Sequence, residues 1–169
     1  MIIEGTHTLP ASRAAVWDML LDADVIAKAT PGTRGMRRLA EGSYVGTMHL
    51  GIGPVVAAEM DLSITLADVV PLQSYALVIR CRGRLASLEG RATIRLADDG
   101  PGTVLHYAAE FQVGGAVVAV GHRLLESLGR IMAKQGLEAL SGELERRLAA
   151  REPGPPPGPP SPSGDARPA

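Results

Sequence analysis

The stretch that decides the fold is residues 102–131, GTVLHYAAEFQVGGAVVAVGHRLLESLGRI. Over residues 105–113 apolar and polar side chains alternate, a period of two that is typical of a β-strand with one buried face. After the glycine pair at 114–115 the apolar residues recur every three or four positions, which predicts a helix over residues 116–149. Roughly 34 residues at 1.5 Å each give a helix about 50 Å long. We therefore expect a strand that leads directly into a long helix.

The rest of the chain predicts a sheet for this helix to cover. Runs with a period of two are separated by Gly, Pro and Asp, and the expected strands are residues 2–9, 34–40, 43–51, 54–67, 73–84, 86–97 and 102–113. Connections this short join antiparallel strands, because a parallel crossover needs a dozen residues or more. Pro10-Ala11-Ser12 opens a helix that ends near Asp22, and residues 23–29 form a second one before Pro31-Gly32. The predicted class is α+β, with a curved antiparallel sheet of six or seven strands wrapped around a long C-terminal helix.

Alternation within the strands assigns one face to the space under the long helix. The apolar side chains that should line this space are Met48, Leu50, Met60, Leu62, Ile64, Leu77, Ile79, Cys81, Leu88, Leu105, Tyr107 and Phe111 from the strands, and Val117, Val120, Leu124 and Leu128 from the helix. Apolar residues make up 46% of the chain and aromatic residues only 3%, so aliphatic side chains must fill the interior and can leave space. Pockets for drug-sized ligands hold about 300 to 1,000 Å³ and are mostly apolar. We therefore predict a cavity for a hydrophobic small molecule; the alternative is a core that Leu and Met fill completely.

Charge and cysteine content narrow the class of protein. With 17 basic and 18 acidic residues the net charge is -1, so nothing attracts the whole chain to nucleic acid. The single cysteine, Cys81, favours a reducing compartment, and we expect a cytoplasmic protein. We see no secretory signal and no run of about 18 apolar residues, the length that spans a membrane. Residues 1–149 should form one domain, and residues 150–169, rich in Pro and Gly, a disordered tail.

Few residues on the predicted inner face could perform chemistry. Cys81 has no His or carboxylate beside it in the alternation, so we interpret it as a lining residue rather than a nucleophile. No metal site is expected from the four scattered histidines, His7, His49, His106 and His122. We therefore predict no catalytic residue. Tyr107 is the better candidate for a polar contact with a ligand, and Tyr44 the second.

Charged side chains on the opposite face allow two interpretations. They could form a basic stripe for an acidic partner, or ion pairs between neighbouring strands, and we favour the pairs. The residues concerned are Arg80, Arg82, Arg84, Arg91 and Arg95 with Glu59, Asp61, Glu89 and Glu110.

Glycines suggest two further features. Gly51, Gly53 and Pro54 at a hairpin form either a mobile gate or a tight turn. The helix glycines each cost about 1 kcal/mol relative to alanine. They should therefore allow close approach of the helix to the sheet, or a groove for a ligand: Gly121, Gly129 and Gly136.

Several short motifs carry a resemblance to a known family. They are Glu4-Gly5-Thr6, Val16-Trp17 with Leu20-Leu21-Asp22, Pro31-Gly32, Gly51-Ile52-Gly53-Pro54-Val55, Gln112-Val113-Gly114-Gly115 and Val120-Gly121. Together with the order of elements, these motifs resemble the carbon monoxide dehydrogenase CoxG family of the START-like, or SRPBCC, helix-grip superfamily, over residues 1–145. The resemblance implies a non-catalytic protein, accessory to a molybdenum-hydroxylase enzyme, that contacts the membrane and binds lipophilic molecules such as quinones. It implies no covalently bound cofactor.

Two other functions share this fold. An enzyme similar to polyketide cyclases or dehydratases would need a titratable group with a shifted pKa inside the cavity. An interaction module similar to chaperone activators of the same superfamily would have a collapsed interior. What lines the interior should therefore separate the three functions.

Overall fold

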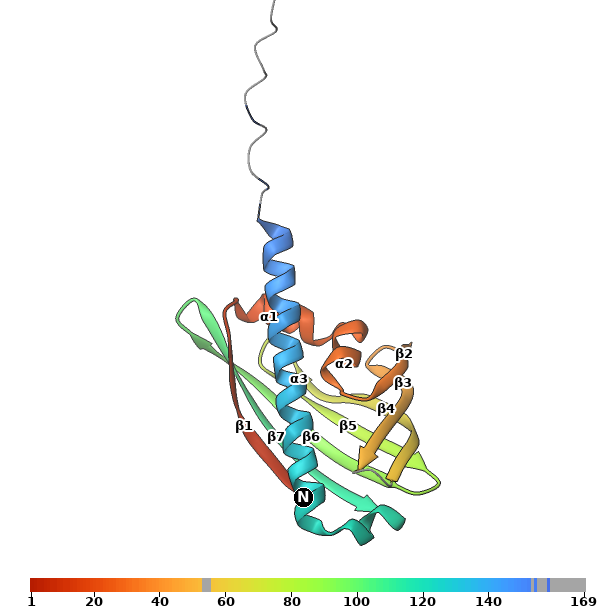
Figure 1. The fold of residues 1–169 in the computed structure, drawn as a ribbon. Helices are drawn as coiled ribbons and strands as arrows, with labels where there is room; N and C mark the ends of the chain where they lie inside the picture. Colours follow the sequence, from red (N-terminus) through yellow and green to blue (C-terminus); the bar gives the residue numbers. More distant parts are fainter. Residues whose placement is uncertain (53–55, 153, 155–157, 159–169) are drawn as a thin grey trace, which may run out of the picture.

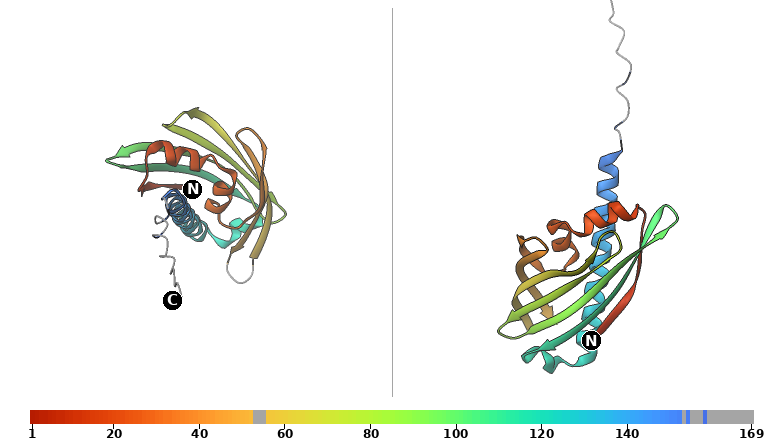
Figure 2. Two further views of the ribbon diagram at one scale, coloured as in Figure 1. Left: turned by 90° about the horizontal axis from the view of Figure 1, so that it is seen from above. Right: turned by 180° about the vertical axis from the view of Figure 1, so that it is seen from behind.

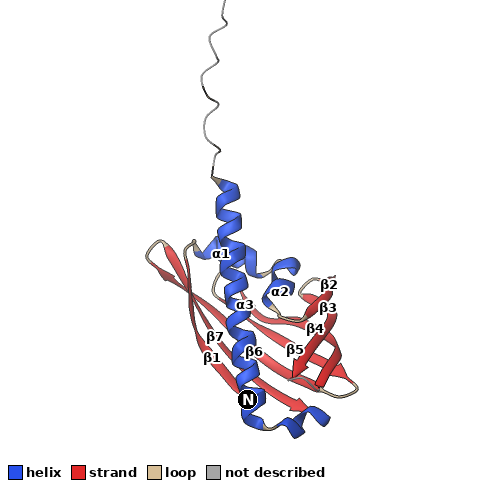
Figure 3. Ribbon diagram, in the orientation of Figure 1, coloured by secondary structure: helices blue, strands red, loops and turns tan. Residues whose placement is uncertain are grey.

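The computed structural model describes residues 1–52 and 56–152, together with Gly154 and Gly158. Its elements are β1 (Ile2–Leu9), α1 (Arg13–Leu20), α2 (Ala23–Ala29), β2 (Thr33–Ala40), β3 (Ser43–Ile52), β4 (Val56–Val70), β5 (Ser74–Gly83), β6 (Ser87–Asp99), β7 (Gly102–Gly114), the 3-10 helix η1 (Ala116–Val120) and α3 (His122–Arg151). Figure 1 shows α3 lying across a curved sheet, with α1 and α2 toward one end, and Figure 3 separates helices from strands by colour. The predicted α+β class is confirmed, and each predicted strand is present close to its expected bounds.

The seven strands form one antiparallel sheet in the order β1-β7-β6-β5-β4-β3-β2. Strands β2 to β7 are consecutive neighbours, as the short connections predict, and β1 returns to pair with β7. The two edges of the sheet are therefore β1 and β2. Figure 2 shows that the sheet curves around the helices, so it has a concave face that carries them and a convex face on the other side.

Polar side chains start the two short helices. Ser12 Oγ accepts a hydrogen bond from the Ala15 amide at 3.3 Å, and Asp22 Oδ1 accepts one from the Asp24 amide at 2.9 Å. Each bond satisfies an amide that the first helical turn leaves without a partner. After α2 the chain turns at Gly32, whose φ of 83° favours glycine. The predicted bounds of α2 are confirmed.

The C-terminal helix differs from the prediction at its start. Residues 116–120 form the 3-10 helix η1, and α3 begins only at His122. Gly121 lies between them with a φ of 101°, which interrupts the helical repeat. Counting apolar residues across this interruption places Leu124 on the inner face, but its side chain is 49% exposed. The buried face of α3 begins instead at Leu125, so the prediction for Leu124 is wrong.

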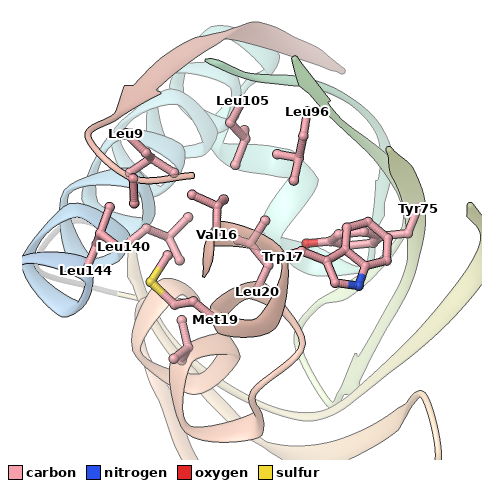
Figure 4. Close-up of a cluster of buried hydrophobic side chains, with 12 residues drawn as sticks. Leu9, Val16, Trp17, Met19, Leu20, Tyr75, Leu96, Leu105, Leu140 and Leu144 are labelled. Atoms are coloured by element: carbon pink, nitrogen blue, oxygen red, sulfur yellow. The ribbon is translucent and has the colours of Figure 1, made fainter. Parts of the chain in front are cut away.

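An apolar cluster fills the end of the molecule that carries α1. We call it the end cluster; its buried members are Leu9, Ala11, Val16, Trp17, Met19, Leu20, Val25, Tyr75, Leu96, Leu105, Leu140 and Leu144. Figure 4 shows most of these side chains meeting between α1, α3 and the sheet. The rings of Trp17 and Tyr75 pack edge to face with centroids 5.6 Å apart. Because its members are at most 7% exposed, the end cluster closes this end of the fold.

Two glycines bring α3 close to its neighbours, as expected. A side chain at Gly136 would meet the backbone oxygen of Ala29, the last residue of α2. A Cβ at Gly129 would lie 2.6 Å from the Cδ1 atom of Ile3 in β1. Gly121 has a different role, since it separates η1 from α3. The glycines therefore place α3 against α2 and the β1 edge.

Two predictions fall outside the described residues. Gly53 and Pro54 of the predicted gate are among them, and so is most of the predicted tail, residues 150–169. Both stay predictions. Within the described part of the chain, α3 extends to Arg151, slightly beyond its predicted end.

Candidate functional site

Most of the predicted lining residues meet in a second apolar cluster on the concave face. We call it the central cluster; its buried members are Ile26, Tyr44, Met48, Ala58, Met60, Leu62, Ile64, Cys81, Ala86, Val117 and Leu125. Partly buried side chains that pack against it include Leu50, Leu77, Ile79, Leu88, Val120, Leu128 and Met132. Twelve of the sixteen predicted lining residues therefore belong to one surface.

The remaining four predicted lining residues lie elsewhere. Leu105 is buried in the end cluster and Tyr107 packs against that cluster. The Phe111 ring lies over Gly90, its partner on β6, where a Cβ would collide with it. Leu124 points away from the interior.

Several side chains on the concave face keep access to water although α3 lies over this face. Leu77 and Ile79 of β5 and Leu88 of β6 are only partly buried, whereas Leu62 and Ile64 of β4 are 2% and 1% exposed. A close-packed core leaves few voids as large as a water molecule, so partial exposure under a helix indicates unfilled space. The structure therefore leaves room beside the central cluster.

The path of α3 explains where this room comes from. The backbone of α3 runs closest to α2, β1 and η1, so only its side chains reach toward the central strands. On β6 and β7 the concave face carries the small residues Ala92 and Ala109, which are paired across the two strands. Small side chains beneath a helix that lies to one side leave volume that the aliphatic neighbours do not fill.

Polar groups on this face are few. The Tyr44 hydroxyl donates a hydrogen bond to the Leu21 carbonyl oxygen at 2.9 Å, so it is already satisfied. Burial raises the pKa of Tyr75 well above its usual range. Burial also raises the pKa of the Cys81 thiol to about 11, and its Sγ atom lies 4.0 Å from Met48 Sδ. These groups are neutral at physiological pH and offer no nucleophile or general base.

The one buried carboxylate, within the part of the chain described, belongs to Glu143 on α3. Its oxygens accept hydrogen bonds from Lys28 at 2.9 Å, Arg146 at 2.6 Å and Arg147 at 3.1 Å. Hydrogen bonds from these three cations, Arg146 first, lower the pKa of Glu143 to about 2. A general acid needs the opposite shift, so this ion cluster holds α3 on α2 rather than supplying a proton.

Sequence reasoning missed three residues of the concave side. Leu125 and Met132 of α3 contact the central cluster, and both fall out of phase when the helix is counted from Val117. The sequence pattern presents His7 only as a possible metal ligand. Its alternation with Ile3 and Leu9 along β1 is the signal that places it on the concave side.

On the convex face the predicted ion pairs are present for two arginines. Arg82 contacts Glu89 at 3.2 Å, and Arg91 contacts Asp68. These contacts support the pairing interpretation over a basic stripe. Exposed pairs of this kind contribute at most about 1 kcal/mol each, so they do not decide the fold.

Comparison with known proteins identifies the family. The family model of the carbon monoxide dehydrogenase protein CoxG matches residues 5–145. The chain belongs to the CoxG family. A search of the curated proteins finds no match for this CoxG-family chain.

Solved structures show the same fold as this CoxG-family chain. A conserved protein from Geobacillus kaustophilus is 23% identical, with a TM-score of 0.80 over 86% of this chain and 96% of that one. A START superfamily protein from Mycobacterium smegmatis is 14% identical, with a TM-score of 0.66 over 86% and 98%. The ZhuI aromatase/cyclase from Streptomyces sp. R1128 is 20% identical, with a TM-score of 0.65 over 90% and 99%. The predicted START-like helix-grip fold is therefore confirmed.

Two further observations concern membranes and metals. Among the described residues, none of the helices combines the length and the apolar character that a membrane crossing requires. In the same part of the chain, no three His, Cys, Asp or Glu side chains gather closely enough to hold a metal ion.

Proposed function

We propose that this CoxG-family protein binds a hydrophobic small molecule between the concave face of its sheet and α3, and that it acts as a carrier rather than a catalyst. One observation carries the proposal: Leu77, Ile79 and Leu88 stay partly exposed beneath the helix. Each of these side chains would release water on contact with an apolar ligand, which contributes about 25 cal/mol per Å² of buried apolar surface.

A carrier fits the chemistry of this surface better than an enzyme. Its titratable groups are a thiol with a raised pKa and tyrosines, and the strongly shifted carboxylate of Glu143 is engaged with three cations. An aliphatic wall binds by shape and desolvation and provides no group to transfer a proton. The ligand should therefore leave chemically unchanged.

The family suggests a partner and a ligand class. CoxG-family membership supports a role beside a molybdenum-hydroxylase such as carbon monoxide dehydrogenase. In this role the protein would carry a quinone and aid membrane recruitment or electron transfer, at the inner face of the cytoplasmic membrane. No covalently bound cofactor is part of this proposal.

An exit for the ligand is proposed at the end opposite the end cluster. Exposed apolar side chains gather around η1 there: Val118 is 49% exposed, and Leu85, whose carbonyl accepts the Val117 amide at 3.1 Å, is 43% exposed. Leu124 follows in the first turn of α3. Replacing Leu124 with Asp should slow transfer of bound decylubiquinone to liposomes without changing its affinity. An unchanged transfer rate would remove this exit.

The binding proposal has a direct test. Purified protein is extracted with organic solvent, co-purified lipids are identified by mass spectrometry, and decylubiquinone is then titrated into the extracted protein. We expect a lipophilic molecule in the extract or saturable binding at one equivalent. Repeatedly empty extracts together with no saturable binding would remove the carrier function and leave only the fold.

A further inference from the structure

A second hollow lies at the edge of the sheet, between β1 and α3. This crevice has a volume of about 670 Å³. Its walls include Ile3 and His7 of β1, Tyr107 of β7 and Leu137 of α3. Tyr107 and Leu137 also pack against the end cluster, so the floor of the crevice is the apolar core itself. A molecule in the crevice would reach the interior without crossing the end cluster.

The Tyr107 hydroxyl is the best-placed polar group in this crevice. Tyr107 is the cross-strand partner of Gly5, and its ring lies over that glycine, with the hydroxyl oxygen 2.5 Å from the position a Cβ would take. Only glycine at this position lets the ring lie flat against the strand. Among the described residues the hydroxyl has no hydrogen-bond partner, so it is free to donate to a ligand.

Two other features of β1 add hydrogen-bonding groups. The His7 Nε2 atom lies 2.7 Å from Ser141 Oγ, which holds the imidazole against α3 at the wall of the crevice. Met1 exchanges backbone hydrogen bonds with Phe111 at 2.9 and 2.8 Å. In an antiparallel pair such bonds recur at every second residue, so the amides of Ile2 and Glu4 point away from β7, on the crevice side. The edge strand thus offers unpaired backbone groups where the crevice lies.

The charges around the crevice decide what kind of ligand fits. Its rim carries Glu4, Arg130, Lys134 and Glu138. The cations already have carboxylate partners, since Arg130 contacts Glu126 at 2.5 Å and Lys134 contacts Glu138 at 4.0 Å. With Glu4 in addition, the rim has no spare positive charge for a carboxylate or phosphate. A neutral head group is therefore favoured over an anionic one.

We propose that the crevice binds the polar head of the carried molecule, and that this head is a neutral group with a hydrogen-bond-accepting oxygen, such as a quinone or ketone carbonyl. Tyr107 donates to that oxygen, and the apolar remainder of the ligand lies along Ile3 and Leu137. The inference rests on the proposed function, because it assigns one end of the same ligand.

The test compares two probes that share an apolar chain. Decylubiquinone carries carbonyl oxygens, and dodecylbenzene carries none. Both are titrated into wild-type protein, Tyr107→Phe and Gly5→Ala, whose new Cβ would push the Tyr107 hydroxyl aside. Loss of one neutral hydrogen bond costs about 1 kcal/mol, so each variant should bind decylubiquinone roughly five- to tenfold more weakly. Dodecylbenzene should bind the three proteins equally.

The outcomes separate this inference from the carrier function. Unchanged decylubiquinone affinity in both variants would overturn the head-group site while the carrier function survives. Tighter binding of dodecanoate than of decylubiquinone would overturn the neutral head. If wild-type protein binds neither decylubiquinone nor dodecylbenzene, the carrier function fails, and this inference fails with it. Circular dichroism spectra that match wild type exclude misfolding as the cause of a loss.

Discussion

The Nζ atom of Lys28 in α2 lies 2.9 Å from Oε2 of Glu143 in α3, and these two residues are 115 positions apart in the chain. The same carboxylate is held by Arg147, which also contacts Asp22 at 2.7 Å. Asp22 in turn begins α2. This ion cluster ties the C-terminal half of α3 to the short helices, and so it fixes one wall of the proposed binding space.

Acid should weaken this attachment. The folded state lowers the pKa of Glu143 from 4.5 to about 2, so its contribution to stability is present above about pH 5 and disappears as the pH falls from 4.5 to 2. Glu143→Gln should therefore be less stable than wild type at pH 7, and the difference should shrink toward pH 2, where both side chains are neutral. Urea unfolding at a series of pH values measures the difference. A gap of constant size across this range would contradict the account.

The contact between α3 and α2 should respond to a single methyl group. Alanine at Gly136 would bring a Cβ against the Ala29 backbone oxygen, which cannot move aside cheaply. We expect Gly136→Ala to lose about 1 to 3 kcal/mol of unfolding free energy despite the better helix propensity of alanine. Gly142, on the same helix, has open space at its Cβ position, so Gly142→Ala should gain about 0.5 to 1 kcal/mol. Equal effects at both positions in urea unfolding would refute the close contact.

The Cys81 thiol should be inert in the folded protein. It is fully buried, and its raised pKa of about 11 leaves little thiolate at pH 8. Ellman's reagent should therefore label native protein at least about a hundredfold more slowly than protein in 6 M guanidinium chloride. Labelling at similar rates would place Cys81 at an accessible surface and reopen the case for a nucleophile.

Sequence patterns predict the sheet well because each strand has one apolar face. The period of two survives in β4 to β7 even where strands are long, and short joints leave little choice of topology. The same alternation places Met60, Leu62 and Ile64 together on the concave face. Local pattern and tertiary burial agree there.

The helix phase could not be predicted, because one backbone angle decides it. The positive φ of Gly121 ends η1 and restarts the helical count, which turns Leu124 outward and Leu125 inward. A glycine at that position is compatible with a continuous helix at a cost of about 1 kcal/mol, so composition alone does not reveal the break.

Contacts between distant segments were also beyond the sequence. The placement of Tyr107 over Gly5 depends on the register between β1 and β7, which joins the two ends of the sheet. Glu143 looks like an ordinary solvated helix residue until α2 brings Lys28 to it. Such pairs appear only once the fold is known.

Binding of decylubiquinone to two variants of α3, measured by isothermal titration calorimetry, tests the central claim most directly. Leu128 is partly buried against the central cluster, whereas Leu124, one turn earlier, is 49% exposed. Leu128→Trp should fill the space beneath α3 and weaken binding by about tenfold or more, while Leu124→Trp should bind within about twofold of wild type. Equal affinity in all three folded proteins would show that the ligand does not lie between α3 and the sheet.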